Sequence, residues 1–132
     1  MNRDLTNNVE VAESIRPQVA SDAVNGETVD LRESDSVAFS VSVGAITGAG
    51  GDATITLEES DNDSDWTDVA DADIIGTEPT LAADTAYQFG YIGDARYVRA
   101  VFALGTETDV AVCVTAVKGD LSASPADYTV TS

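Results

Sequence analysis

The residues best suited to chemistry are gathered in one acidic segment, Glu58–Trp66. Asp61, Asp63 and Asp65 occupy alternate positions in it, like the first ligands of a calcium loop, where oxygen atoms must converge on one cation. The remainder of an EF-hand loop is missing, because the sixth position is not glycine and the twelfth is Ala72. Asx-rich turns between strands are also common, since their side chains cap their own backbone. The segment therefore predicts a solvated hairpin turn, with Asp61, Asp63 and Asp65 as an alternative calcium site.

Other catalytic groups are scarce. The chain has no histidine and a single cysteine, Cys113, which excludes a Ser-His-Asp triad, a cysteine–histidine dyad and histidine-ligated zinc. Glu58 and Glu59 are adjacent in a predicted strand and point to opposite faces, which is unsuitable for the paired carboxylates of a glycosidase. We therefore expect a protein that is not an enzyme and uses no cofactor. We expect Cys113 to behave as a small buried hydrophobe.

Aromatic residues form a short stripe, with Tyr87, Phe89 and Tyr91 at alternate positions. A flat aromatic platform can stack sugars, whereas alternating aromatics in a β-protein more often belong to a core or a subunit contact. We favour a core or subunit contact and keep the ligand platform as the alternative.

The elements that position these residues are predicted to be strands. Apolar and polar residues alternate in short runs separated by turn residues, which is typical of half-buried antiparallel strands. The strongest runs are Val37–Val43, Ala53–Glu59, Thr85–Ile92, Arg96–Leu104 and Asp109–Val117. Together with weaker runs they predict an all-β protein, either an antiparallel β-sandwich or a small barrel, of about seven to eight strands.

The chain divides into an N-terminal arm (residues 1–26), a β-sandwich domain (27–121) and a C-terminal tail (122–132). The first segment is polar, lacks clean periodicity and contains Pro17 and an Asn25–Gly26 turn signal. We expect an extended arm that either frays or becomes ordered against another chain. The predicted interface residues are apolar or aromatic: Val9, Val11, Ile15, Val19, Tyr87 and Tyr91.

Charge restricts the possible partners. Acidic residues number 24 and basic residues 6, giving a formal net charge of −18. Such a field repels the phosphates of nucleic acids and anionic membrane surfaces, so we expect neither as a partner. The N-terminus shows no secretory signal, and no apolar run is long enough to cross a bilayer, which predicts synthesis in a host cytoplasm.

Several short motifs resemble small proteins encoded among the head genes of tailed bacteriophages, over about residues 9 to 120. The matching motifs are turns and strand cores: Ile15-Arg-Pro17, Asn25-Gly26, Val29-Asp-Leu31, Ser36-Val-Ala-Phe39, Val43-Gly44, Leu57-Glu-Glu-Ser-Asp61, Trp66-Thr-Asp-Val69 and Tyr97-Val-Arg99. The resemblance implies a virion structural protein that decorates or cements the capsid by binding the major capsid protein. Where such proteins commonly have an Asp-Gly turn before the tryptophan, this chain has Asn62-Asp-Ser-Asp65, which keeps the calcium alternative open.

The acidic composition agrees with a position on the outer surface of the head, away from packaged DNA. Two alternative functions remain: a virion surface module that binds host carbohydrate, and a structural component of the tail or head–tail connector. A closed symmetric homo-oligomer is the usual solution for such proteins, and we favour a trimer.

Overall fold

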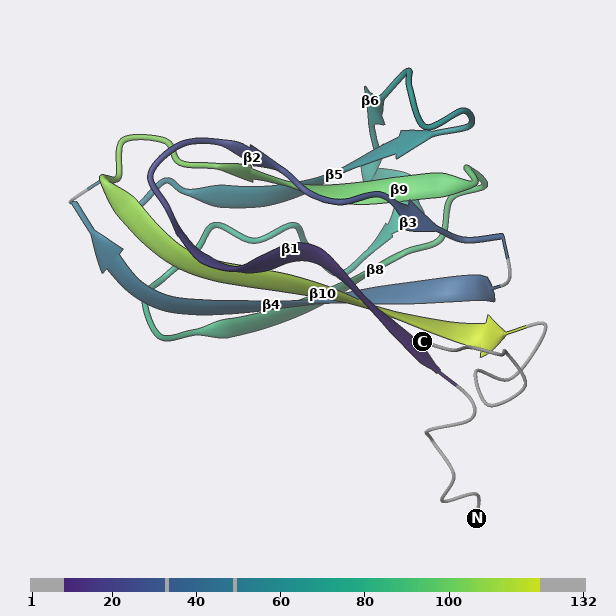
Figure 1. Cartoon of the computed structure of the whole chain (residues 1–132), viewed down its shortest axis with the longest axis horizontal. Helices are drawn as coiled ribbons and strands as arrows, with labels where there is room; N and C mark the ends of the chain where they lie inside the picture. Colours follow the sequence, from purple (N-terminus) through teal and green to yellow (C-terminus); the bar gives the residue numbers. More distant parts are fainter. Residues whose placement is uncertain (1–8, 33, 49, 122–132) are drawn as a thin grey trace, which may run out of the picture.

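The computed structural model describes residues 9–32, 34–48 and 50–121 (Figure 1). The six longer strands are β1 (Glu10–Ala20), β4 (Ser34–Thr47), β5 (Thr54–Ser60), β8 (Ala86–Tyr91), β9 (Tyr97–Ala103) and β10 (Asp109–Leu121). Four strands have two residues each: β2 (Val24–Asn25), β3 (Val29–Asp30), β6 (Thr67–Asp68) and β7 (Ile74–Ile75). A short 3-10 helix spans Asp71–Asp73, and within the described residues no helix could cross a membrane.

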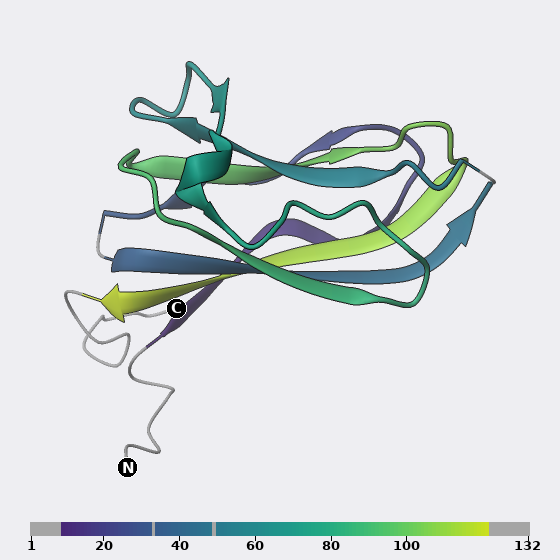
Figure 2. The same cartoon turned by 180° about the vertical axis from the view of Figure 1, so that it is seen from behind.

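The strands form two antiparallel sheets that pack as a sandwich, as Figures 1 and 2 show from opposite sides. Sheet A has the order β1-β10-β4-β8-β7, and sheet B has the order β2-β9-β5-β6, with β3 also paired to β9. The predicted antiparallel sandwich is confirmed, and the sheets do not close into a barrel. The ten strands exceed the predicted seven to eight because two-residue strands are too short to show an alternating pattern.

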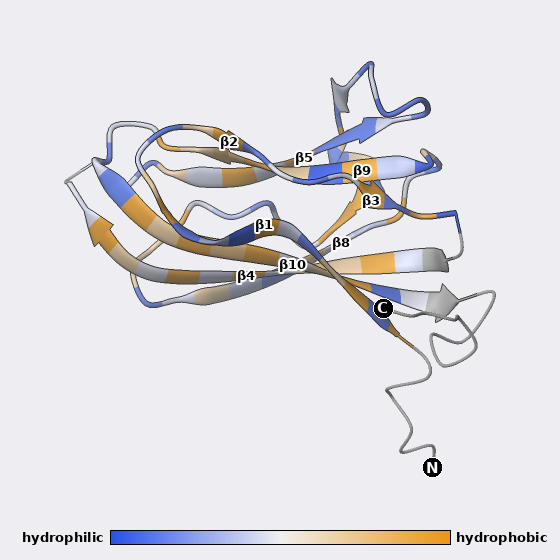
Figure 3. Ribbon diagram, in the orientation of Figure 1, coloured by the Kyte–Doolittle hydropathy of each residue, from blue (hydrophilic) through white to orange (hydrophobic). Residues whose placement is uncertain are grey.

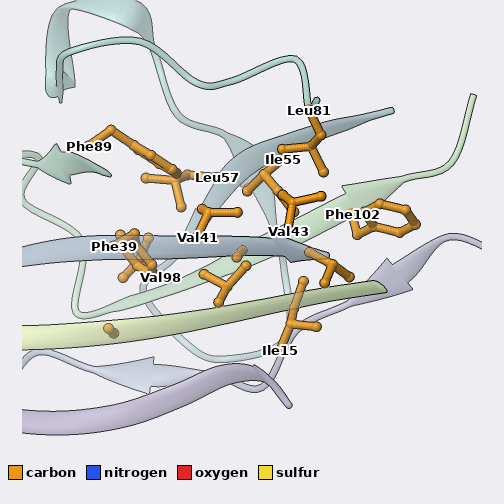
Figure 4. Close-up of a cluster of buried hydrophobic side chains, with 14 of the residues drawn as sticks. Ile15, Phe39, Val41, Val43, Ile55, Leu57, Leu81, Phe89, Val98 and Phe102 are labelled. Atoms are coloured by element: carbon orange, nitrogen blue, oxygen red, sulfur yellow. The ribbon is translucent and has the colours of Figure 1, made fainter. Parts of the chain in front are cut away.

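The core lies between the two sheets and is built from the predicted alternation (Figure 4). Phe39 of β4 is fully buried and stacks on Phe89 of β8, with ring centroids 5.8 Å apart. Burying a side chain of this kind stabilises the fold by about 1.5–3 kcal/mol. Other buried members are Ile15, Val41, Val43, Ile55, Leu57, Leu81, Val98, Phe102, Val112 and Val114.

The predicted N-terminal arm is wrong for the residues that the structure describes. Strand β1 pairs antiparallel with β10 from Glu10–Lys118 to Ala20–Val110, and Ile15 is only 1% exposed. Two register shifts, one on each side of Ile15, interrupt the ladder and remove the regular alternation that would have revealed the strand. Pro17 is tolerated because β1 lies at the edge of sheet A. Residues 1–8 and the predicted tail at 122–132 lie outside the described residues.

Ser14 joins β1 of sheet A to sheet B. Its side chain is buried, and its Oγ accepts a hydrogen bond from the Ala100 N–H at 3.0 Å and donates to the Glu27 carbonyl at 3.2 Å. The Ser14 carbonyl in turn accepts from the Glu27 N–H at 2.5 Å. Glycine is required at Gly26, since a Cβ there would lie 2.6 Å from both the Ala100 carbonyl oxygen and the Ser14 Oγ. This joint makes β1 an integral part of the sandwich.

Candidate functional site

The acidic segment forms an exposed hairpin turn between β5 and β6. Asn62 organises it: its Oδ1 accepts from the N–H groups of Ser64 and Asp65, at 2.9 and 2.8 Å. The Asn62 amide group donates to the Asp65 carboxylate at 2.9 Å. Asp63 has a positive φ of 60°, and its carboxylate accepts from the Thr28 hydroxyl at 2.6 Å. The turn is therefore held by its own side chains, as predicted.

The structure does not support the calcium alternative. Asp61, Asp63 and Asp65 are exposed, and Asp63 and Asp65 direct a carboxylate oxygen at different neighbours, Thr28 and Asn62. Among the described residues, no three side chains of the types that bind metals converge on one point. Alternate positions in the sequence do not bring these carboxylates together, because the turn reverses the chain between them.

Carboxylates nevertheless dominate this side of the molecule. A polar hollow beside the hairpin is lined by Glu59, Asp61, Asp65, Asp73 and Asp94. This concentration of carboxylates is unfavourable for an anionic partner.

The tyrosines pack in the core, as favoured from the sequence, and do not form a flat ligand platform, so the prediction of Tyr91 as an interface residue is corrected. Tyr91 is 2% exposed, and its hydroxyl donates to Glu59 at 2.7 Å and accepts from the Ala95 N–H at 3.1 Å. Burial and the hydrogen bond to Glu59 raise the pKa of Tyr91 well above its usual range. Tyr87 is half-buried, and its hydroxyl accepts from the Ala82 N–H at 2.9 Å. Both residues therefore belong to the core and its margin.

The outer face of sheet B is charged, and its cations are paired. Arg99 of β9 contacts Glu58 of β5 at 2.6 Å and stacks over the Trp66 ring at 4.3 Å. Arg96 pairs with Asp30 at 3.1 Å on the same side of the molecule. Such partly exposed pairs add little stability, but they give this face a polar character.

The outer face of sheet A is different and forms the candidate functional surface, here called the neutral face. It consists of the outward-facing residues in the middle of the three central strands, β4, β8 and β10, which alternate with the buried ones. These residues are Ser36, Ala38, Ser40, Ser42, Ala86, Gln88, Gly90, Ala111, Cys113, Thr115, Val117 and Gly119. None of them carries a charge, although charged residues make up 23% of the chain. Asp109, the first residue of β10, also faces outward and places a carboxylate at the end of this face. Figure 3 shows the contrast between the hydrophilic β5–β6 hairpin and the less polar β4 and β10.

Large aliphatic side chains lie at the margins of the neutral face. Val11 and Val19 of β1 are 62% and 67% exposed, and Ile75 of β7 is 58% exposed. Their register partners are Val117, Ala111 and Gly90, so all three point to the same side of sheet A. Glu13 of β1 also faces outward and carries a charge, and Arg16 of the same strand is exposed.

Two shallow, mainly apolar depressions lie along the neutral face. One is lined by Ile75, Phe89 and Val117, and also by Val9, which the sequence predicted as an interface residue. The other is lined by Val19, Ala111 and Cys113. Of the predicted interface residues, Val9, Val11 and Val19 lie at this surface, whereas Ile15 is in the core. Cys113 is half-buried on the neutral face rather than inside the sandwich.

The end of the sandwich is closed by two carboxylates that bind backbone amides of facing loops. Glu107 is 7% exposed and accepts from the N–H groups of Gly50 and Gly51, at 2.8 and 3.0 Å. In the reverse pairing, Asp52 of the first loop accepts a hydrogen bond from the Thr106 N–H of the second loop at 2.9 Å. This reciprocal arrangement gives both carboxylates a structural role.

Within the part of the chain that the structure describes, three carboxyl groups have shifted pKa values. Burial raises the pKa of Glu78, and the nearby Asp71 adds to the shift, while the hydrogen bond from the Leu57 N–H at 2.6 Å opposes it. The hydrogen bond from Arg96 lowers the pKa of Asp30, and the hydrogen bond from the Thr106 backbone lowers that of Asp52.

We predict that stability passes through a maximum in mildly acidic solution. Glu78 has a raised pKa in the folded state, so protonation favours folding: the free energy of unfolding should rise as pH falls through this raised pKa toward the ordinary value of 4.5. Asp30 and Asp52 have lowered pKa values, so the stability they contribute should be lost only below about pH 4. Urea unfolding midpoints across this range test the profile. Glu78→Gln should flatten the rise above pH 4.5, and an unchanged profile in this variant would contradict the assignment.

Comparison of the chain with protein-family models, curated proteins and solved structures found no match. The fold and surface therefore define the chain by themselves as an acidic antiparallel β-sandwich in which the centre of one sheet face is uncharged.

Proposed function

We propose that this chain is a non-catalytic capsid decoration or cement protein of a tailed bacteriophage, which binds the outer surface of the head and stabilises the shell. The observation that supports this role most directly is the separation of charge between the two sheets. The acidic hairpin and hollow lie beside sheet B, whereas the central strands of sheet A present the neutral face. A protein with these two sides can attach through one and remain hydrated on the other.

The charge also favours the outside of the head. A net charge of −18 would be repelled by DNA packaged inside the shell, whereas no such repulsion acts on the outer surface. The partner in this proposal is the major capsid protein. The sequence motifs that resemble phage head proteins support the same role.

We further propose assembly as a closed homo-oligomer, with a trimer at local three-fold positions of the capsid favoured. Closed rings are the usual solution for identical subunits, and a capsid lattice supplies such axes. Several neutral faces bound together would gain affinity through multivalency without any new kind of contact.

Binding of the purified protein to emptied shells that lack it tests the proposal. Because the centre of the neutral face has no charge to be screened, we predict that the bound amount holds or rises between about 0.05 M and 0.5 M sodium chloride. Co-sedimentation of protein with shells measures it. Absence of binding would overturn the proposed function, and release at high salt with the shell intact would show that charge attraction holds the protein.

Neither alternative function gains support from a particular observation. A carbohydrate-binding platform built on Tyr87 and Tyr91 is disfavoured, since Tyr91 is buried and the hydroxyl groups of both residues are engaged within the domain. Copy number distinguishes a tail or connector protein, which forms a single ring, from a decoration protein, which is present in many copies per head.

A further inference from the structure

We propose that residues 76–80, here called the edge cover, close the outer edge of β5 as a strap that Glu78 latches and that opens locally when this side chain is ionised. The inference is independent of the proposed function. It assigns a conformational switch to one edge of sheet B, on the side of β5 away from β9.

Strand β5 has two kinds of neighbour on this outer edge. Strand β6 pairs with its C-terminal part, and the edge cover lies along its N-terminal part. The Ile55 N–H donates to the Pro79 carbonyl at 3.2 Å, and Thr54 forms an isolated antiparallel bridge with Thr80. Because an uncovered strand edge offers its N–H and C=O groups to other chains, the edge cover keeps this side of sheet B closed.

At the junction between the edge cover and β6, a side chain takes the place of a strand. A continued antiparallel ladder would bring the Leu57 N–H to the Thr77 carbonyl. The Leu57 N–H donates instead to Glu78 Oε2 at 2.6 Å, and the Leu57 carbonyl accepts from the Val69 N–H at 3.1 Å. Leu57 is only 1% exposed, so its N–H depends on Glu78 for an acceptor.

The surroundings of Glu78 disfavour its charge. The side chain is half-buried, and the charged groups that act on it are the carboxylates of Asp71 in the 3-10 helix and Asp68 in β6. Burial raises the pKa of Glu78, the hydrogen bond from Leu57 opposes the shift, and both aspartates add to it.

The two ends of the edge cover are anchored, which confines the motion to the residues between them. Before it, β7 pairs with β8. After it, Leu81 is 3% exposed, and its N–H donates to the Ala53 carbonyl at 2.8 Å. Gly76, which begins the cover, has a positive φ of 89° that glycine adopts without strain.

The direction of the switch follows from the charge of Glu78. The protonated group still accepts from Leu57 through its carbonyl oxygen and is not repelled by Asp71 and Asp68. The ionised group gains hydration and distance from both aspartates when it leaves β5. The edge cover is therefore closed most firmly at low pH and opens more often as pH rises through the raised pKa of Glu78.

Hydrogen exchange of single amides in the full chain, followed by NMR, tests the switch. We expect the Ile55 and Leu57 N–H groups to exchange by a local opening that is insensitive to urea below the unfolding transition. Their protection factors, which correct for the intrinsic pH dependence of exchange, should fall as pH rises above 4.5, the ordinary value for glutamate.

Three variants identify the latch. Glu78→Gln keeps an acceptor oxygen but cannot ionise, so protection at Leu57 should no longer depend on pH. Glu78→Ala removes the acceptor, and protection at Leu57 should fall about tenfold or more. The matched control Glu13→Gln replaces an exposed carboxylate on β1, changes the net charge equally and should behave like the wild type.

Urea-independent exchange that depends on pH in the wild type and in Glu13→Gln, but not in Glu78→Gln, supports the inference. Exchange of Ile55 and Leu57 that follows global unfolding in urea would overturn it, because the edge cover would then open only with the whole domain. This comparison uses the wild type alone, so it holds even if a variant fails to fold. Protection that is independent of pH in the wild type, or a pH dependence that persists in Glu78→Gln, would also overturn the inference.

Discussion

Removal of residues 1–20 should leave a chain that no longer folds cooperatively. The deletion takes away all of β1 and exposes the edge of β10. It also removes Ile15 from the core, a loss of about 2–5 kcal/mol for a side chain of this size, and it leaves the buried Ala100 N–H without the Ser14 hydroxyl. The hydrogen bonds between β1 and β10 are lost as well. The summed loss of free energy is comparable to the total stability of about 5–15 kcal/mol that a domain of this size has.

Single substitutions in β1 test its structural role without removing the strand. Ser14→Ala should lower the free energy of unfolding by about 1–3 kcal/mol, because a buried N–H loses its acceptor. The control Gln18→Ala, at an exposed position of the same strand, should change it by no more than about 0.5 kcal/mol. Urea unfolding followed by Trp66 fluorescence measures all three proteins. A truncated protein with an unchanged unfolding midpoint would show that β1 is a dispensable arm after all.

A charge placed at the centre of the neutral face should weaken attachment to emptied shells about 100-fold or more. Ser40 is exposed on the central strand β4, so a lysine or glutamate there should be tolerated in the free protein. In the bound state the new charge would be buried without a partner, which costs about 3 kcal/mol or more, and each 1.4 kcal/mol is a factor of ten in affinity. The matched control is Thr56→Lys on the outer face of sheet B, which should bind like the wild type.

The sign of the charge separates the possible partners. Equal loss of binding for Ser40→Lys and Ser40→Glu indicates that the partner surface opposite Ser40 is uncharged. Weak binding of Ser40→Lys with normal or tighter binding of Ser40→Glu would reveal a basic partner surface and contradict attachment through the uncharged centre of the neutral face. Circular dichroism of each variant establishes that the sandwich is still folded.

The sandwich could be predicted from the sequence because apolar and polar residues alternate regularly in most of its long strands. Val37, Phe39 and Val41 of β4 are all buried, as the pattern predicts. Strand β1 escaped detection because its two register shifts break the alternation and Pro17 suggested an interruption. The bridge from Ser14 to Ala100 spans 86 positions, so no local pattern could indicate it.

The candidate surface was harder to predict than the fold. Isolated apolar residues suggested a contact surface. Ile15, however, points into the core where the β1–β10 pairing is irregular. Tyr91 is also buried, and its hydroxyl group is hydrogen-bonded to Glu59 and to the Ala95 N–H. The useful signal was the absence of charge at alternate positions, such as Ser40 and Ser42. It becomes meaningful only when the pairing of β4 with β8 and β10 shows that these positions form one continuous surface.

The measurement that tests the central claim most directly is a reconstruction of the intact virion that encodes this chain. We predict density for the β-sandwich in many copies on the outside of the head, with sheet A toward the shell and the β5–β6 hairpin toward solvent. Density only at the tail or neck, density on the inner surface of the shell, or absence of the protein from the particle would contradict its function as a capsid decoration protein.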